Sequence, residues 1–403
     1  MVVIPASMGL MNKRTLLGRL QRVRHATRAA LAKSLGMSQP TAGKIVEELL
    51  ALGILEEAGE GDHGNNGHPP RLGRPGRLLR LDRAQVRFLA IELGVQETRL
   101  AAVPLGLGEM DRWDIVFATP ASAADWECEL RTASSRLKQS EFWGVLISVP
   151  GLVDDAAGRV IFSPNLHWTE HQELPQLLRR VWGSPVELVQ EERALALGHQ
   201  VFDANTEDFL LVDFGDGVGG AAVVGGRLYN NPLPISGELG HTPVIGNTRV
   251  CGCGAQGCVE TLISVRGLLE SCPVEGGGQA ATWEMLQARI RKHGVEPWLR
   301  RALDATSVVI AGALNVLGLR RVVLTGSLTE LPSAVCEYLT EAVLRGCMWA
   351  RFGRLECRTA PRRRLAGLVA AAIDRLVLPL ESGSRTEERS VSMSMSMSVS
   401  VSN

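Results

Sequence analysis

The feature that most constrains the folding of this chain is a cluster of one histidine and three cysteines within residues 237–260, GELGHTPVIGNTRVCGCGAQGCVE. The four side chains are His241, Cys251, Cys253 and Cys258. Three thiolates and one imidazole complete a tetrahedral zinc shell, and glycines between the cysteines allow the tight turns that bring them together. Because four protein ligands leave no position for water, we expect a structural zinc ion that fixes this loop. The alternative is a set of free thiols beside a buried histidine.

The bulk properties of the chain exclude several classes of protein. A length of 403 residues suits two or three domains, and a hydrophobic content of 45% is enough for large buried cores. No apolar stretch is long enough to cross a membrane, and the N-terminal residues lack the pattern of a signal peptide. We therefore expect a cytoplasmic protein with no membrane partner. Thiols stay reduced in that compartment, which favours a metal site over disulfides.

Residues 10–81 have the pattern of a winged helix-turn-helix domain. Apolar residues recur at spacings of three and four within residues 12–57, and two of the expected helices are joined by a short Gly-Met turn. A segment rich in Gly, Asn and Pro follows, and RLLRLD then alternates like a strand, which is typical of a long wing. Residues 12–80 hold twelve basic and six acidic side chains, whereas the whole chain has a net charge of zero. This local excess of positive charge favours DNA as a partner.

The expected contacts with operator DNA lie on the second helix of this motif and on the wing. Polar and basic side chains at the start of the helix can reach base edges or phosphates in a major groove, and arginines in the GRPGR turn can enter a minor groove or bind phosphates. The candidate residues are Ser38, Gln39, Thr41, Lys44, Arg74 and Arg77. The alternative is a helical adaptor domain with a solvated, charged surface.

The remainder of the chain has an α/β pattern. From residue 86 buried strands such as FLLVDF alternate with amphipathic helices. We divide this body into one lobe over residues 82–200 and a second lobe over residues 201–380, which includes the zinc loop and a terminal helix. Residues 381–403 contain a Met-Ser run of low complexity, which predicts a disordered tail.

Three sets of motifs resemble the ROK family of repressors, open reading frames and sugar kinases. GELGH followed by CGCGAQGCVE is similar to the family signature, SVPGLVDDAAGRVIFSPNLHW to a second motif, and the N-terminal segment to the winged head of the repressor branch. The resemblance implies a two-lobed, actin/hexokinase-like body with a sugar cleft, and a homodimer or a dimer of dimers. It also implies sugar contacts, which are Asn165, Glu191, Glu238, His241 and Glu260.

The positions that would carry kinase chemistry depart from the family pattern. In the first phosphate loop Val95 stands for a glycine and Glu97 for a lysine, and in the second loop Asp216 stands for a threonine. A carboxylate that faces a triphosphate weakens its binding. Glu191 occupies the position of the family's catalytic aspartate, one methylene longer, and a displacement of about 1 Å can cost on the order of 10²-fold in rate. We therefore assign no catalytic residue and expect no efficient phosphoryl transfer.

These observations predict a sugar-responsive DNA-binding regulator of carbohydrate metabolism genes, and a repressor fits better than an activator. A ligand can change DNA binding only if the two conformations differ in their affinity for it. Two alternatives stay open. One is an ATP-dependent sugar kinase of the same family, and the other is a regulator whose body senses a protein partner while the cleft is vestigial.

Overall fold

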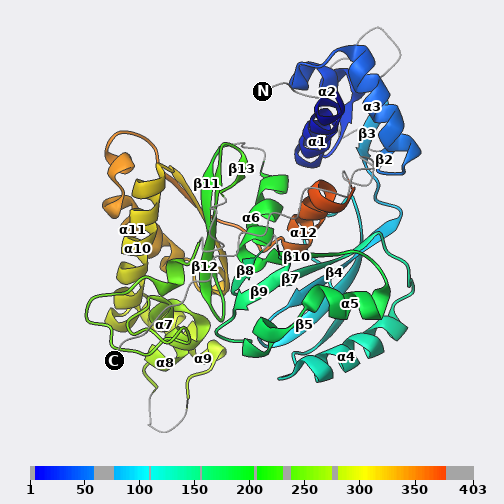
Figure 1. The fold of residues 1–403 in the computed structure, drawn as a ribbon. Coiled ribbons are helices and arrows are strands. Elements are labelled where there is room, and N and C mark those ends of the chain that lie inside the picture. The colour runs from blue at the N-terminus through cyan, green and yellow to red at the C-terminus, as the bar shows by residue number, and fades with distance from the viewer. Residues whose placement is uncertain are drawn as a thin grey trace, which may run out of the picture.

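The computed structural model describes residues 5–58, 77–108, 110–154, 157–203, 207–229, 237–274 and 280–377, with side chains from residue 9. It consists of a small N-terminal head above a body of two α/β lobes (Figure 1). The wing tip, with the candidate DNA contact Arg74, and the tail from residue 381 lie outside the described residues.

The head contains three helices and a three-stranded sheet. The helices are α1 (Pro5–Val23), α2 (Arg28–Leu35) and α3 (Gln39–Ala51), and the strands are β1 (Ala26–Thr27), β2 (Leu55–Glu57) and β3 (Leu78–Leu81), in the order β1-β3-β2. The Thr27 hydroxyl accepts a hydrogen bond from the Ala30 amide and caps α2, and Gly36 ends α2 with a φ of 62°. Ser38 caps α3 in the same way through the Thr41 amide. Helix, tight turn and helix thus follow one another as the sequence predicted.

The first lobe is built on a five-stranded sheet with the order β10-β7-β4-β5-β6. Its strands are β4 (Val86–Leu93), β5 (Glu97–Pro104), β6 (Ile115–Ala118), β7 (Gly144–Val149) and β10 (Val186–Gln190). Alternate residues of β4 face opposite cores, as the pleat requires. Leu89 and Ile91 pack with α4 (Ala123–Arg136) and α5 (Leu174–Trp182), whereas Phe88 and Ala90 pack with residues of α6 (Glu191–Phe202) and α12 (Arg364–Ala372). A two-stranded sheet of β8 (Leu152–Asp154) and β9 (Arg159–Phe162) and the short η2 (His167–His171) complete this lobe.

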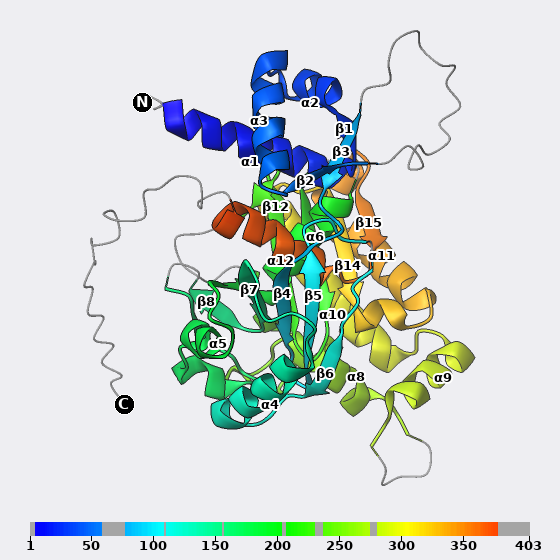
Figure 2. The same cartoon turned by 90° about the vertical axis from the view of Figure 1, so that its right-hand side faces the viewer.

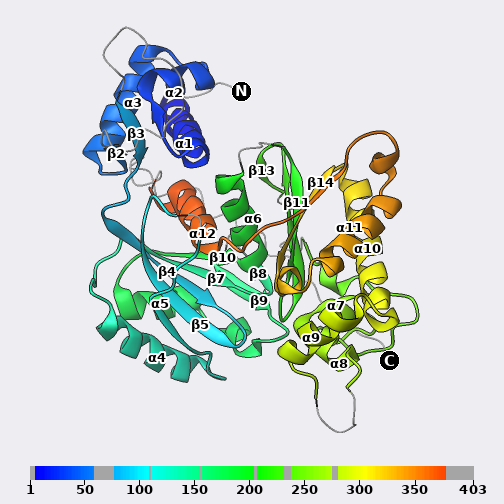
Figure 3. The ribbon, with the colours of Figure 1, turned by 180° about the vertical axis from the view of Figure 1, so that it is seen from behind.

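The second lobe has its own five-stranded sheet with the order β13-β12-β11-β14-β15. Its strands are β11 (Phe209–Phe214), β12 (Val218–Val224), β13 (Arg227–Leu228), β14 (Arg321–Gly326) and β15 (Glu356–Thr359). The helical elements are η3 (Leu239–His241), α7 (Glu260–Ile263), α8 (Val265–Ser271), α9 (Trp283–His293), α10 (Pro297–Leu317), η4 (Ser327–Glu330), α11 (Ala334–Gly346) and η5 (Met348–Arg351). Leu195 and Ala196 of α6 pack on the opposite face of this sheet from α10 and α11. Helix α6 therefore lies between the two sheets (Figure 3).

The chain returns to the first lobe after β15. Residues 360–363 cross between the lobes, and α12 then packs against α6, β4, β7 and β10, ending in η6 (Ile373–Val377). The sequence analysis assigned this terminal helix to the second lobe, but its apolar residues fill the core of the first. The leucines of α1 belong to the same continuous core, so α12 lies between the head and the first lobe (Figure 2). Within the described residues, no helix is long and apolar enough to span a membrane.

Candidate functional site

A cleft of about 480 Å³ lies between the two lobes. All five candidate sugar contacts line it, although they come from separate parts of the chain: Asn165, Glu191, Glu238, His241 and Glu260. Both expected phosphate loops contribute to the same cleft through Gly94 to Glu97 and Gly215 to Gly219. The fold therefore brings together the residues that the motifs singled out, and the positions that depart from the kinase pattern lie beside them.

The sugar side of the cleft is formed by the ends of short elements of the second lobe. Glu238 precedes η3, and its Oε1 accepts a hydrogen bond of 3.4 Å from Gln190 Nε2. Glu260 begins α7, and its Oε2 accepts a hydrogen bond of 2.9 Å from the Val218 amide. Burial raises the pKa of Glu238, and the negative charge of Glu260 acts in the same direction, whereas His241 and Gln190 oppose the shift. The exposed Asn165 lies across the cleft.

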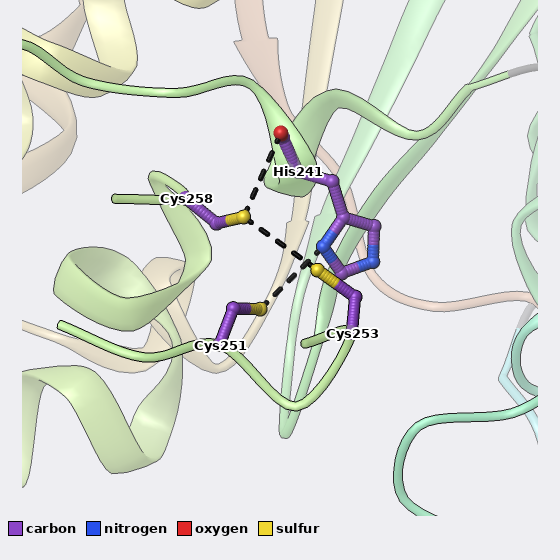
Figure 4. Close-up of side chains that lie close together, drawn as sticks. All are labelled: His241, Cys251, Cys253 and Cys258. Carbon is purple, nitrogen blue, oxygen red and sulfur yellow. Dashed lines mark hydrogen bonds between the residues drawn. The ribbon is translucent and has the colours of Figure 1, made fainter. Parts of the chain in front are cut away.

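The histidine and the three cysteines converge on one point beside this side of the cleft (Figure 4). His241 Nδ1 lies 3.6 Å from Cys251 Sγ, and Cys253 Sγ lies 3.7 Å from Cys258 Sγ. A tetrahedral zinc site with bonds of about 2.3 Å to sulfur and about 2.0 Å to nitrogen separates its ligands by about 3.5–3.8 Å. The donor set therefore fits a zinc ion, and all four ligand atoms lie within 4.8 Å of one another.

The backbone of this loop explains why glycines separate the cysteines. Gly254 has a φ of 87° and Gly257 a φ of 84°, and a Cβ on Gly257 would lie 2.8 Å from the Asn247 carbonyl oxygen. The other ring nitrogen of His241, Nε2, lies 3.7 Å from Glu238 Oε2 in the cleft. The His241 imidazole thus faces the cysteine cluster with Nδ1 and the sugar side of the cleft with Nε2. This arrangement lets a bound metal orient a ligand contact.

The phosphate side of the cleft contains two arginines that the sequence analysis missed. Arg362 donates two hydrogen bonds of 2.8 Å to the two carboxylate oxygens of the buried Asp213 and a third, of 3.2 Å, to the Phe214 carbonyl oxygen. Hypothetical Cβ atoms on Gly215 and Gly326 would lie 2.8 and 2.7 Å from Arg362 Nη2. The guanidinium therefore fills the space between the two glycine turns where a nucleotide phosphate would approach the backbone.

The second arginine, Arg364, is almost completely buried and forms ion pairs with Glu92 and Glu191. Burial raises the pKa of Glu191, and the positive charge of Arg364 acts against that shift. Asp111 accepts hydrogen bonds of 2.7 and 3.2 Å from the amides of Arg364 and Leu365, so it caps the start of α12. The carboxylate at the family's catalytic position is thus held in an ion pair. The only sequence feature that could have indicated these arginine ion pairs was the run of three arginines at the start of the terminal helix.

The substituted loop positions lie in the cleft as well. Glu97 is half-exposed and lies 3.0 Å from Arg99. Asp216 makes no hydrogen bond or ion pair with any described residue, and burial raises its pKa. Both carboxylates line the cleft and therefore lie at the space that a triphosphate would occupy.

The candidate DNA contacts form one exposed group at the start of α3. Ser38, Gln39, Thr41 and Lys44 are all exposed. Ser38 and Thr41 also contact each other through their hydroxyls at 2.7 Å, so the capping interaction fixes both side chains. Arg77 is exposed and forms an ion pair with Glu57 at the base of the wing.

Comparison with known proteins identifies the relatives of this chain. The ROK family model matches residues 89–373. A putative xylose repressor from Caldicellulosiruptor sp. (strain Rt8B.4) is 28% identical over 64% of this chain, and the match covers 65% of that relative. An N-acetylmannosamine kinase from Escherichia coli O6:K15:H31 is 30% identical over 71% of this chain and 97% of the kinase.

Two solved structures have the same fold. A ROK family transcriptional regulator, a homologue of the E. coli MLC protein, aligns over 93% of this chain and 98% of its own with a TM-score of 0.69 at 19% identity. A ROK family glucokinase from Streptomyces griseus, in complex with glucose and AMPPNP, aligns over 72% and 98% with a TM-score of 0.57 at 22% identity. The predicted fold class is thereby confirmed, because one neighbour covers the head and the body together and the other covers the body alone. With the family model extending over most of its length, the chain belongs to the ROK family.

Proposed function

We propose that this protein is a sugar-responsive, DNA-binding transcriptional regulator of carbohydrate metabolism genes, and that it acts as a repressor. The observation that carries the proposal is the contrast within the cleft. Arg362 fills the space between the two glycine turns, and Arg364, buried behind the lining, pairs with Glu92 and Glu191. On the sugar side, Glu238, His241 and Glu260 line the cleft. A head with an exposed polar helix start packs against α6 and the core of the first lobe. The xylose repressors among the relatives support the same function. Because the matches cover less than two thirds of those relatives, the effector sugar and the operator sequence are proposals.

A sugar kinase is the less favoured alternative. The kinase relatives support it, but Arg362 donates through Nε and Nη2 to Asp213, and this ion pair offsets the positive charge that would attract a triphosphate. The positive charge of Arg364, which pairs with Glu191 Oε1, makes this carboxylate a weaker proton acceptor than it would be without the arginine. Phosphoryl transfer depends almost entirely on positioning and on stabilising charge, and both are compromised at these positions.

We propose that the His241 and cysteine site holds a structural zinc ion. Burial raises the pKa of the Cys251 thiol, so its thiolate form needs a nearby cation. The zinc would hold the loop that carries Glu238, His241 and Glu260 and would supply no chemistry to the sugar. We expect the protein in the cytoplasm, where thiols stay reduced and where operator DNA is found.

We propose further that three consecutive arginines couple the cleft to the head. Arg362 binds Asp213 of the second lobe, and Arg364 binds Glu92 and Glu191 of the first. Between them, Arg363 stacks on the Phe202 ring at 4.7 Å, and Arg24 at the end of α1 stacks on the same ring at 3.7 Å. Movement of one lobe against the other pulls on this segment and therefore on the end of α1. In a homodimer, such a shift changes the spacing of two heads on paired half-sites.

The test is a fluorescence-anisotropy titration of the purified chain against its own promoter DNA at several salt concentrations, and at one of these concentrations with and without a panel of monosaccharides. We expect tight, salt-sensitive binding that one sugar releases. Lys44→Ala should weaken DNA binding about tenfold and reduce the salt slope by about one, because one phosphate contact is lost. Lys292→Ala, an exposed lysine on α9, is the matched control and should change neither.

The outcomes separate the alternatives. Specific DNA binding that no sugar alters, together with no sugar-induced thermal shift, would favour a body that senses a protein partner. Failure to bind the promoter at any salt concentration, together with ADP production from a hexose and Mg-ATP, would replace the regulator by a kinase.

A further inference from the structure

Glu192 is a cleft residue that neither the motifs nor the proposed function uses. It is the second residue of α6, directly after Glu191, and α6 lies between the two sheets. Its carboxylate lies against the backbone of Gly219 at the start of β12, where a methyl group on that glycine would be 2.3 Å from Glu192 Oε1. Because Gly219 has no side chain, it leaves the space that Glu192 occupies, and Glu192 lines the cleft.

The Glu192 carboxylate is only partly satisfied by the protein, through a hydrogen bond with its own backbone that acts against the rise of its pKa. Its Oε2 is buried and has no hydrogen-bond partner among the described residues. Burial raises the pKa of Glu192 well above its usual value, and the negative charges of Glu191 and Glu238 add to this shift. A buried carboxylate oxygen without a partner is costly, so such a group in a functional cleft points to a ligand group that completes it.

Among the described residues that line the cleft, no arginine is free to complete this carboxylate. Eight carboxylates line the cleft against two arginines, Arg99 and Arg362, and Arg364 behind the lining pairs with Glu92 and Glu191. Arg362 is already bound to Asp213, and Arg99 lies 3.0 Å from Glu97 and 3.5 Å from Glu92. A cleft with this excess of negative charge concentrates cations and repels anions. A divalent metal is not favoured, because the one described cluster of three or more ligands close enough for a metal ion is the histidine and cysteine site.

We propose that the cleft binds a sugar that carries a protonated amino group, and that Glu192 is the specificity-determining residue that receives it. An ammonium group donates charge-assisted hydrogen bonds, which are about twice as strong as neutral ones. Glu238 and Asn165 remain for neighbouring hydroxyls. Phosphorylated sugars and sugar acids are excluded by the same charge. This inference rests on the proposed sugar-binding function and names the class of its ligand.

The test is isothermal titration calorimetry on the full-length, zinc-loaded chain with glucosamine, mannosamine and galactosamine, each compared with its parent hexose, its N-acetyl derivative and its 6-phosphate. The pH is chosen so that the free amine is protonated. We expect one amino sugar to bind at least tenfold more tightly than both its parent and its N-acetyl derivative, and no 6-phosphate to bind. Glu192→Gln should remove this preference and leave the affinity for the parent hexose within about twofold. Glu97→Gln, which changes a cleft carboxylate that Arg99 already satisfies, should keep the preference.

Other outcomes overturn the inference in distinguishable ways. Equal or tighter binding of a neutral or phosphorylated sugar by the unmodified chain overturns it and leaves the sugar-responsive regulator standing; this comparison does not depend on the variant's folding. If a folded Glu192→Gln protein keeps the preference for the amino sugar over its parent hexose, another residue determines the specificity, and the role of Glu192 is overturned. Absence of binding by every sugar overturns both this inference and the sugar response.

Discussion

The two sides of the interlobe cleft differ in how their charged groups are satisfied. On the phosphate side, Asp213 binds Arg362, and Glu92 and Glu191 bind Arg364, so carboxylates from both lobes find partners on one crossing segment. On the sugar side, the contacts of Glu238 with described residues are a 3.4 Å hydrogen bond from Gln190 and a 3.7 Å contact with His241. The first side therefore holds its carboxylates in ion pairs with arginines, and the second holds Glu238 through longer contacts.

Under the proposed function, this difference explains how a cleft in a fold shared with kinases could bind a sugar without transferring phosphate to it. Arg362 fills the space between two glycine turns, and Arg362 and Arg364 pair with acidic groups of both lobes. The segment between β15 and α12 makes this arrangement possible. It passes between the lobes, and α12, which follows it, packs beneath the head. Substitutions on the two sides should therefore have different consequences for stability, sugar binding and catalysis.

The largest effect should come from Arg364→Ala. Removing one partner of a buried ion pair leaves the other charge uncompensated and costs about 3–5 kcal/mol. We expect the midpoint of urea unfolding of the body to fall accordingly. Arg266→Ala, which removes an exposed pair with Glu270 on α8, should change the stability by less than about 0.5 kcal/mol. If the two variants unfolded at the same urea concentration, Arg364 would not stabilise the phosphate side of the cleft.

The next effect concerns the carboxylate that caps α12. Burial raises the pKa of Asp111 to about 6, although the amides of Arg364 and Leu365 act against the shift. The folded state therefore holds the proton more tightly than the unfolded state, so the stabilising contribution is present at about pH 4 and is lost as the pH rises to about 6. We expect a loss of about 2 kcal/mol over this range.

The measurement for Asp111 is a series of urea unfolding curves at several pH values. Asp111→Asn keeps an acceptor for the helix cap and removes the titration, so the slope between about pH 4 and 6 should become shallower than in the unmodified chain. A slope that persists unchanged in Asp111→Asn would assign the titration to another group.

On the sugar side, removal of zinc should weaken sugar binding and spare DNA binding. Cys253→Ser leaves three ligands and frees the loop that carries Glu238 and Glu260, so we expect sugar affinity to fall at least tenfold, or about 1.4 kcal/mol. Metal content by mass spectrometry and calorimetry with the effector sugar measure the two effects. Cys128→Ser, an exposed cysteine of α4, is the control. Unchanged sugar affinity in a zinc-free protein would separate the metal site from the cleft.

Sequence analysis proposed candidate residues on the sugar side but overlooked the arginines of the phosphate side, and the reason is physical. His241 and the three cysteines lie close together in the chain, so their spacing alone restricts how they can converge. The helix-turn-helix is equally local, because caps such as Ser38 act within one turn. Arg364, by contrast, pairs with Glu92 at a separation of 272 residues, and no periodicity reports such a contact. The same limit explains why the terminal helix was assigned to the wrong lobe and why Glu192 was overlooked beside Glu191.

The smallest effect should come from restoring the kinase residue in the second phosphate loop. Asp216→Thr replaces a carboxylate by the hydroxyl donor that the family resemblance implies for kinases, yet Arg362 would still fill the space between Gly215 and Gly326, and Glu191 would still be bound to Arg364. We therefore expect ADP production with a hexose and Mg-ATP to stay at the background level of the unmodified chain. A coupled enzyme assay measures it, with the variant's thermal stability as the control for folding. Robust turnover in Asp216→Thr would mean that the loop residue alone blocks the reaction and that the arginines move aside, which would remove the distinction between the two sides of the cleft.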